Sequence, residues 1–229
     1  MLNKTLLPHS VARQLQAMIQ TGDWKEGQKI PSQRDLSHTF GISRASLREA
    51  LLTLESLGLV KTEPGRGTFV TKPGSVAKDD AGSWRYADSY SVFDVFQTRV
   101  LLEGEIARLA AGRLTHYQFD EMEQANVAME ESWAKQDLVA NVEADLAFHA
   151  TIVSACSNAV LRDLYDAVRD KLTETQRQPI PRTDPERMKA SVGEHRKIVA
   201  ALRAGDAKAA REAMEEHIRN TAQCAGLEP

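Results

Sequence analysis

The sequence predicts a mostly α-helical protein in which three short helices and a small β-hairpin precede an all-α bundle of six or seven helices. Three observations lead to this prediction. Hydrophobic residues make up 42% of the 229 residues, which is enough for real cores and argues against a disordered chain. Helical periodicity dominates both ends of the sequence. Glycine and proline are concentrated between residues 64 and 82, where the helical pattern is interrupted.

The amino-terminal part predicts three helices, because each periodic stretch is followed by a glycine that can end it. These helices are expected at about residues 9–21, 32–40 and 43–57. Ser32 and Ser43 can cap the second and third helices by accepting hydrogen bonds from amide groups of the first turn. Residues 59–61 and 68–70 predict two short strands joined by a tight turn. This part therefore predicts a helix-turn-helix followed by a hairpin.

Residues 71–83 are small and polar and predict a linker. We expect a first domain at residues 1–73, a linker at 74–83 and a second domain at 84–229. No run in the second domain alternates long enough to suggest a sheet, so it should be all-α. Its helices are expected near residues 84–89, 92–114, 116–134, 137–155, 158–177, 185–204 and 206–225. The loop at residues 178–184 contains two prolines and is the main break.

The two parts carry opposite charge. The net charge of the chain is −3, but residues 1–73 hold ten basic and six acidic side chains, so the remainder is strongly acidic. Such asymmetry suggests a basic contact module joined to an acidic body. No apolar run reaches the ~18 residues of a membrane span, and the first residues lack an export signal, so no membrane partner is expected. With only two cysteines, the reducing cytoplasm is the simplest compartment.

The third helix has the features of a DNA-recognition helix. Leu47, Leu51 and Leu54 lie on one face and anchor it, while Arg44 and Arg48 point away. An arginine can bond guanine with two hydrogens at once in the major groove. Serine hydroxyls and a hairpin-tip arginine suit phosphate oxygens or the minor groove; the candidates are Ser32, Arg34, Ser43, Ser46 and Arg66. The alternative is that these arginines are only a solvated helix face.

Four motifs in fixed order carry a family resemblance. They are residues 29–36 (KIPSQRDL), 41–51 (GISRASLREAL), 58–60 (GLV) and 65–70 (GRGTFV). Over roughly residues 8–72 the chain resembles the winged helix-turn-helix domain of GntR-family transcription regulators. This resemblance implies that DNA-contacting positions of the family are matched by Arg34, Arg44, Arg48 and Gly67, with Ser32, Ser43, Ser46 and Arg66 as neighbours.

Four residues of the second domain can converge on a metal ion. Asp145 and His149 are four residues apart, so their side chains project from the same face of one helix. His195 lies ten residues before Gly205 and His217 twelve after it, ~15 and ~18 Å from a helical hairpin bend at 1.5 Å per residue. Imidazole and carboxylate suit zinc first, with nickel, cobalt or manganese as alternatives. The competing interpretation is that each histidine is only a hydrogen-bonded core or surface imidazole.

The second domain also carries a family resemblance. It is similar to the ligand-binding FCD-type helical domain of the FadR subfamily, through residues 99–103, 145–149, 157–158 and 194–195, and His217. The resemblance implies a metal site at the four residues above, a small organic acid beside it, and Arg99 facing the pocket to pair with a carboxylate. The alternative is that Arg99 only forms an ion pair with Glu103 one turn away.

These observations favour a ligand-responsive transcription regulator that is not an enzyme. A homodimer would read a short palindromic operator in double-stranded DNA, because one recognition helix contacts only a few base pairs. The family resemblance favours a repressor that a small carboxylate releases. Two alternatives remain: a metal-dependent hydrolase or lyase that carries a DNA-binding domain, and an architectural DNA protein whose helices serve only assembly.

Overall fold

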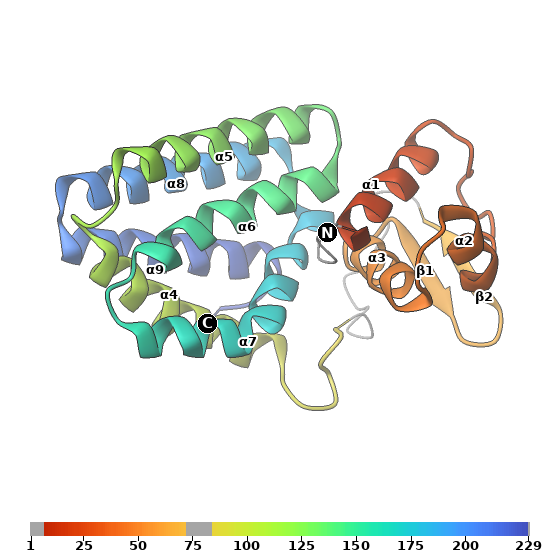
Figure 1. Cartoon of the computed structure of the whole chain (residues 1–229), viewed down its shortest axis with the longest axis horizontal. Helices are drawn as coiled ribbons and strands as arrows, with labels where there is room; N and C mark the ends of the chain where they lie inside the picture. The colour runs from red at the N-terminus through yellow and green to blue at the C-terminus, as the bar shows by residue number, and fades with distance from the viewer. Residues whose placement is uncertain (1–6, 72–83, 229) are drawn as a thin grey trace. The chain divides into compact units, whose positions relative to one another are not determined.

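The computed structural model describes residues 7–71 and 84–228, with side chains from residue 9 onward (Figure 1). Within these residues it contains nine α-helices and one two-stranded antiparallel hairpin, which confirms the mostly α-helical class. The described residues form two compact units: residues 7–71 together with Asp137–Val139, and the remainder of residues 84–228. The predicted linker at residues 74–83 lies outside the described residues. Among the helices that the structure describes, none is long and apolar enough to cross a membrane.

The first unit is a helix-turn-helix with a hairpin. Its elements are α1 (Leu7–Gln20), α2 (Gln33–Phe40), α3 (Arg44–Ser56), β1 (Val60–Glu63) and β2 (Gly67–Val70). The two predicted caps form, because Ser32 accepts from the Asp35 amide and Ser43 accepts from the Ser46 amide. Gly41 ends α2 in the left-handed conformation at φ 63°, which a glycine adopts without strain.

One face of α3 is buried, as its periodicity predicts. Leu47 and Leu54 have no exposed surface, and Leu51 is 4% exposed. Leu15 of α1 and Leu36 of α2 are also buried, and α3 packs against both of these helices. The apolar face therefore fixes α3 within the unit, and the first turn of α3 is left at the surface.

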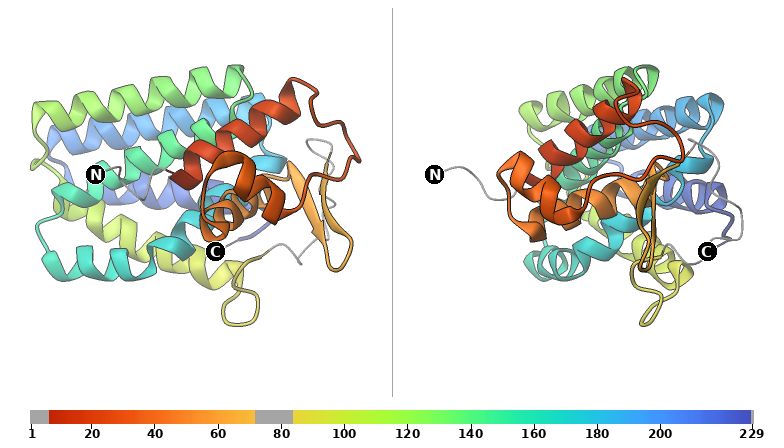
Figure 2. Two further views of the ribbon diagram at one scale, coloured as in Figure 1. Left: turned by 45° about the vertical axis from the view of Figure 1, so that its right-hand side comes forward. Right: turned by 90° about the vertical axis from the view of Figure 1, so that its right-hand side faces the viewer.

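The second unit is a bundle of long helices (Figure 2). They are α4 (Val92–Ala110), α5 (His116–Ala134), α6 (Leu138–Ala155), α7 (Ala159–Arg177), α8 (Pro185–Ala204) and α9 (Ala207–Cys224). Helix α4 packs against α7 and α9, and α8 packs against α5 and α9. The loop before α8 contains a short 3-10 turn, Ile180–Arg182. The core of the bundle is apolar around Phe96, Met122, Phe148, Ile152 and Ile198, each 0–1% exposed.

Two details of the predicted bundle are wrong. The expected short helix at residues 84–89 is a series of turns, held by the bond from Trp84 Nε1 to the Tyr90 carbonyl at 2.6 Å. A capping box of Ser91 and Asp94 then begins α4, which separates these turns from the helix. Helix α4 also ends four residues early, because Gly112 adopts φ 70° and its amide bonds the Leu202 carbonyl of α8.

Candidate functional site

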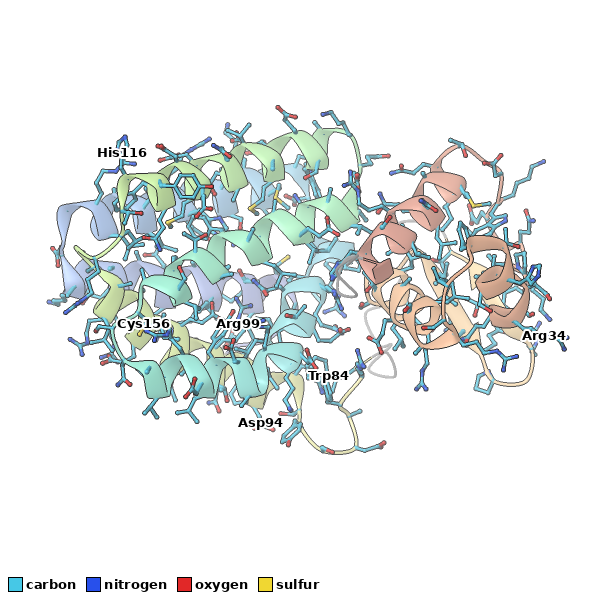
Figure 3. The ribbon with its side chains drawn as sticks, in the orientation of Figure 1. Arg34, Trp84, Asp94, Arg99, His116 and Cys156 are labelled. Atoms are coloured by element: carbon cyan, nitrogen blue, oxygen red, sulfur yellow. The ribbon has the colours of Figure 1, made fainter. Side chains whose placement is uncertain are left out.

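The arginines predicted to contact DNA lie at the surface of the first unit. Arg34, Arg44 and Arg48 are exposed, and Figure 3 shows Arg34 projecting outward from α2. Arg34 and Arg44 line one open depression between α2 and the start of α3. The structure thus brings these two arginines together across the turn that joins the helices.

The serines of this surface have a local structural role. The Ser32 hydroxyl donates to the Asp35 carboxylate at 2.7 Å, and the hydroxyls of Ser43 and Ser46 lie 2.9 Å apart. These bonds hold the first turns of α2 and α3 in place. Each hydroxyl oxygen keeps further hydrogen-bonding capacity, so a phosphate contact remains compatible with the caps.

The hairpin shows two constraints that the sequence did not reveal. Arg66 pairs with Glu63 across the turn, and its guanidinium carbon lies 5.6 Å from the centre of the Phe69 ring. Gly67 has φ 117°, and a Cβ there would lie 2.5 Å from Lys29 Cε. The positive φ therefore explains the glycine at position 67. Arg66 bonds Glu63 through Nη1 alone, so its other N–H groups stay available to a phosphate.

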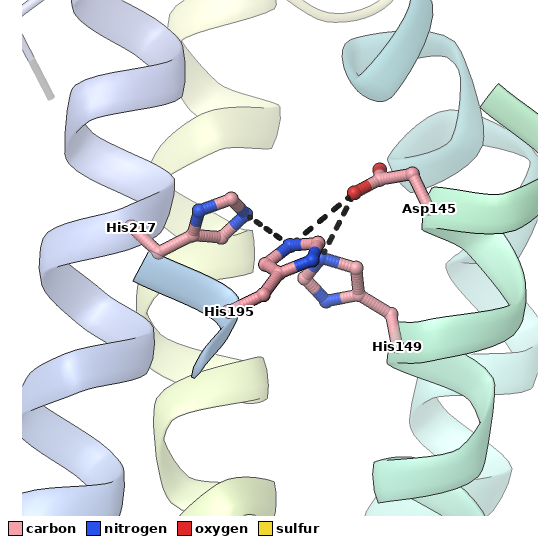
Figure 4. A group of neighbouring side chains, drawn as sticks. All are labelled: Asp145, His149, His195 and His217. Carbon is pink, nitrogen blue, oxygen red and sulfur yellow. Dashed lines mark hydrogen bonds and ion pairs between the residues drawn. The ribbon is translucent and has the colours of Figure 1, made fainter. Parts of the chain in front are cut away.

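The four predicted metal ligands converge inside the second unit (Figure 4). Asp145 and His149 lie on α6, His195 on α8 and His217 on α9, and one ligand atom from each lies within 4.8 Å of the others. His195 Nε2 is 3.3 Å from His217 Nε2 and 3.4 Å from Asp145 Oδ1. The three imidazoles are at most 2% exposed. The convergence comes from three helices and is therefore a property of the fold.

Each imidazole turns its other nitrogen toward an oxygen of a neighbouring helix. Nδ1 of His149 lies 2.6 Å from Glu103 of α4, although without the angles of a regular hydrogen bond. Nδ1 of His195 lies 2.9 Å from Asn126 Oδ1 of α5, and Nδ1 of His217 lies 2.9 Å from Glu194 Oε2 of α8. The two hydrogen bonds place the proton on Nδ1 of His195 and His217, so Nε2 of these rings keeps its lone pair and points it into the cluster. The short contact of His149 Nδ1 with the Glu103 carboxylate favours the same tautomer.

This arrangement of lone pairs fits a cation. With both protons on Nδ1, no hydrogen lies between the Nε2 atoms of His195 and His217 at 3.3 Å, so their lone pairs repel. His149 Nε2 is buried and has no hydrogen-bond partner among the described residues. Three nitrogens and the Asp145 carboxylate form a donor set that divalent transition metals accept. The residues present therefore fit a metal ion, and nothing in the set selects one metal.

The protonation states favour ligation. Burial lowers the pKa of His195 well below 6.5, and the neighbouring His217 and His149 lower it further. Burial also lowers the pKa of His217, although its hydrogen bond to Glu194 opposes this effect. Burial alone would raise the pKa of Glu194, but its bonds to Arg187 and His217 outweigh burial and bring the value to about 2. At neutral pH, these two imidazoles are neutral and Glu194 is ionised.

Arg99 forms the ion pair considered from the sequence and also lies at a pocket. It is 1% exposed, and its Nε donates to Glu103 at 2.7 Å, as the ion-pair interpretation requires. Arg99 also lines a pocket of about 40 Å³, open to solvent on one side, together with Asp145 and His217 of the cluster. Burial alone would raise the pKa of Glu103, but the charge of Arg99 and the hydrogen bond from its Nε outweigh burial and hold that pKa well below the ordinary value. Glu103 thus joins Arg99 to the histidine cluster.

Several residues of this region were missed as functional candidates. Glu103 holds Arg99 and His149, Asn126 holds His195, and Gln176 donates to Asp145 Oδ2 at 2.8 Å. Glu194 is held by two hydrogen bonds from Arg187. A weak signal existed for Arg187 and Glu194, because a spacing of seven residues places them on one helix face. Asn126 and Gln176 carry no such signal.

Comparisons with known proteins agree with this architecture. Residues 7–70 match the model for bacterial regulatory proteins of the gntR family, and residues 94–220 match the model for the FCD domain. The chain is 31% identical to the HTH-type transcriptional regulator LutR of Bacillus subtilis, over 89% of this chain and 94% of that protein. It is 29% identical to the Uxu operon transcriptional regulator of Escherichia coli, over 87% of this chain and 79% of that protein.

A third relative and one solved structure extend the comparison. The chain is 28% identical to a putative L-lactate dehydrogenase operon regulatory protein of Escherichia coli, over 93% of this chain and 83% of that protein. The solved structure of Escherichia coli McbR/YncC covers 99% of this chain and 98% of its own, with a TM-score of 0.58 at 18% identity. At that identity the structural likeness shows the fold alone.

Proposed function

We propose that this chain, which belongs to the GntR family of bacterial transcriptional regulators and carries an FCD domain, senses a small carboxylate at a metal ion in its helical domain. It is a DNA-binding transcription regulator, and its matched relatives are transcriptional regulators, not enzymes. The observation that carries the proposal is the set of three Nε2 lone pairs and one carboxylate beside a pocket that Arg99 also lines.

The division of labour follows the two compact units. Residues 1–73 form the DNA-binding domain, residues 74–83 form the linker, and residues 84–229 form the effector-binding and dimerisation domain. In the first domain, Arg34, Arg44 and Arg48 contact DNA together with Gly67. Their neighbours in the contact are Ser32, Ser43, Ser46 and Arg66. The shared depression of Arg34 and Arg44 supports this assignment, because a groove edge or phosphate can meet both at once.

The metal is held by Asp145, His149, His195 and His217. Zinc is the first candidate, with nickel, cobalt and manganese as alternatives. When bound, the ion supplies an electrophilic point with open coordination positions for a carboxylate oxygen. Glu103, Asn126 and Glu194 orient the three imidazoles, and Gln176 orients the Asp145 carboxylate.

The effector is a small organic acid whose carboxylate lies between the ion and Arg99. Arg99 uses its Nε for Glu103 and directs Nη1 toward Thr175 Oγ1 at 3.4 Å, so the guanidinium keeps further N–H donors. A relative named for an L-lactate dehydrogenase operon supports an effector of this chemical class. Binding of the acid would lower the affinity for DNA, so we assign the chain as a repressor.

The functional unit is a homodimer. Leu101 of α4 and Val160 and Leu164 of α7 are large apolar side chains with 67%, 66% and 53% of their surface exposed. Helices α4 and α7 pack against each other, so an apolar dimer contact across this pair would cover such side chains. Two copies related by a two-fold axis place two α3 helices on the half-sites of a short palindrome.

Elemental analysis tests the proposal first. We expect about one metal ion per chain in protein purified without a metal-affinity column, and none after Asp145, His149, His195 and His217 are all changed to alanine. The matched control is His116→Ala. His116 is an exposed histidine at the start of α5 and does not belong to the cluster (Figure 3). Absence of metal after reconstitution with zinc, nickel and manganese would refute the metal site. If no small carboxylate changes the affinity for DNA, the alternative of an architectural DNA protein would be favoured.

A further inference from the structure

Arg187 lines the pocket, and both terminal nitrogens of its guanidinium donate hydrogen bonds to Glu194. Its Nη1 donates to Glu194 Oε1 at 2.7 Å and its Nη2 donates to Glu194 Oε2 at 2.8 Å. The side chain lines the same pocket as Arg99, Asp145 and His217 and is 20% exposed. A guanidinium has five N–H donors, and the pair with Glu194 uses two of them. The remaining edge, at Nε, is able to bind an acceptor in the pocket.

Glu194 connects this arginine to the proposed metal site. Its Oε2 accepts from Nδ1 of His217, and its Oε1 accepts from Asn220 at 2.8 Å. The carboxylate is thus held from three sides, and it fixes the position of Arg187 as firmly as that of His217. Arg187 is therefore a rigid donor at a set distance from the metal ligands, which is the property that ligand discrimination needs.

The polar groups beside Arg187 are neutral. Thr183 and Ser191 line the same pocket, and Ser191 lies one helical turn after Arg187 on α8. The Thr183 hydroxyl already donates to the Pro179 carbonyl at 3.0 Å, so Arg187 and Ser191 are the groups that can bond a ligand hydroxyl away from the ion. An alkyl tail at this end of the pocket would displace water from the Arg187 guanidinium without replacing its hydrogen bonds, whereas a hydroxyl would replace them.

The charges around the pocket limit the charge of the ligand. Arg99 and Arg187 contribute two positive charges, and a divalent ion would add two more. Asp145, Glu103 and Glu194 contribute three negative charges, so one positive charge is left over. A ligand with one carboxylate neutralises it, whereas a dicarboxylate leaves a negative excess in a partly buried site.

We propose that Arg187 is a specificity-determining residue of the effector pocket, and that it selects monocarboxylates carrying hydroxyl groups beyond the carboxylate end that meets the metal. This inference rests on the proposed function, since it takes the metal-bound carboxylate as one end of the ligand. Arg187 contacts the distal hydroxyls through its free edge, and Glu194 holds it in place for that contact.

Two probes of equal charge and length test this assignment. 2-Hydroxybutanoate and 2,3,4-trihydroxybutanoate present the same carboxylate and 2-hydroxyl to the metal and differ only in the distal hydroxyls. Calorimetric titration of the zinc-loaded full chain gives the ratio of their dissociation constants. We expect the trihydroxy acid to bind about tenfold more tightly, as one or two hydrogen bonds to a charged donor would give. In Arg187→Met the ratio falls to about threefold or less.

Three further variants keep the test decisive. Arg196→Met is the matched control, because Arg196 lies on the same helix and pairs with Glu130 outside the pocket, so the ratio stays at the wild-type value. Arg187→Lys keeps the positive charge but loses the planar guanidinium that forms two parallel hydrogen bonds. It gives a ratio of dissociation constants between those of the wild type and Arg187→Met. Arg187→Met combined with Glu194→Gln leaves no unpaired Glu194 carboxylate, and it replaces the single variant if that protein fails to fold.

The outcomes separate this inference from the proposed function. A zinc-loaded wild type that binds both acids equally, or an Arg187→Met protein that keeps the full preference, overturns the role of Arg187 alone. Zinc binding with no affinity for either acid overturns the hydroxy-acid class. Failure of the wild type to bind zinc or another divalent ion overturns the proposed function itself.

Discussion

The two units of the chain use arginine in opposite environments. Arg34, Arg44 and Arg48 of the first unit are exposed, and local caps at Ser32 and Ser43 set where their helices begin. Arg99 of the second unit is 1% exposed and shares Glu103 with His149 of another helix. An exposed guanidinium is suited to a large partner such as DNA, which brings its own phosphates, whereas a buried guanidinium is accessible only to a small ligand that enters the fold.

This difference also determines what salt and mutation do. Ions in solution screen the exposed arginines, so contacts of the first unit with DNA weaken as salt rises. The buried pair of Arg99 and Glu103 is shielded from solvent, but it is costly to break because each partner would leave a charge without compensation.

Glu103→Ala should destabilise the second unit by ~3–5 kcal/mol, because it leaves the buried guanidinium of Arg99 without its carboxylate. Urea unfolding monitored by circular dichroism measures the change. The matched control is Glu105→Ala on the same helix, whose pair with Arg108 is exposed to solvent, so its loss should leave the free energy of unfolding almost unchanged. Equal effects of the two changes would remove the distinction between buried and exposed pairs.

Removal of the metal by a chelator should cause the second-largest loss of stability. A ligand present at about 100 times its dissociation constant stabilises a protein by ~2.7 kcal/mol, so a chelator should lower the melting temperature of the metal-loaded chain. The effect should disappear in His195→Ala, which loses a ligand that is fully buried. Scanning calorimetry with and without chelator measures it, and a shift of the same size in His195→Ala would exclude the cluster as its source.

Arg44→Ala should weaken operator binding by ~1–3 kcal/mol and relax the preference at one base position, because Arg44 lies exposed at the start of α3. Fluorescence anisotropy on operator and on random DNA of equal length distinguishes the two possible contacts. An equal loss on both DNAs would make Arg44 a phosphate contact.

Arg66→Ala should have the smallest effect, since its pairing with Glu63 offsets part of any gain from a phosphate. We expect weaker binding to all sequences and a decrease of about one in the slope of log affinity against log salt. Titrations at several salt concentrations measure that slope. A slope equal to that of the wild type would exclude a phosphate contact by the wing.

Much of the fold could be predicted because its determinants are local. Caps such as Ser43 and left-handed glycines such as Gly41 mark helix ends within a few residues, and periodicity identified the buried face of α3. The turns at residues 84–89 escaped prediction because a bond from the Trp84 indole to the Tyr90 carbonyl, not local propensity, decides their conformation. The early end of α4 at Gly112 likewise depends on a contact with α8.

The candidate site divides in the same way. Asp145, His149, His195 and His217 could be brought together from helix spacing and one hairpin bend. The oxygens that orient the imidazoles could not, because Glu103 and Asn126 come from helices whose rotation about their axes is set only by packing of the whole bundle. Arg99 shows the same limit, since the sequence offered two interpretations, and the structure contains the pair with Glu103 and places Arg99 at a pocket.

The three oxygens behind the histidines are not equivalent, and this inequality bears on metal preference. His149 and His217 face ionised carboxylates, which raise the electron-donating power of an imidazole, whereas His195 faces the neutral amide of Asn126. His195 is therefore the weakest donor of the three. A single change of Asn126 to aspartate would equalise them without touching any ligand. Metal preference at the proposed site could therefore be altered without exchanging a ligand, because position 126 sets how strongly His195 donates.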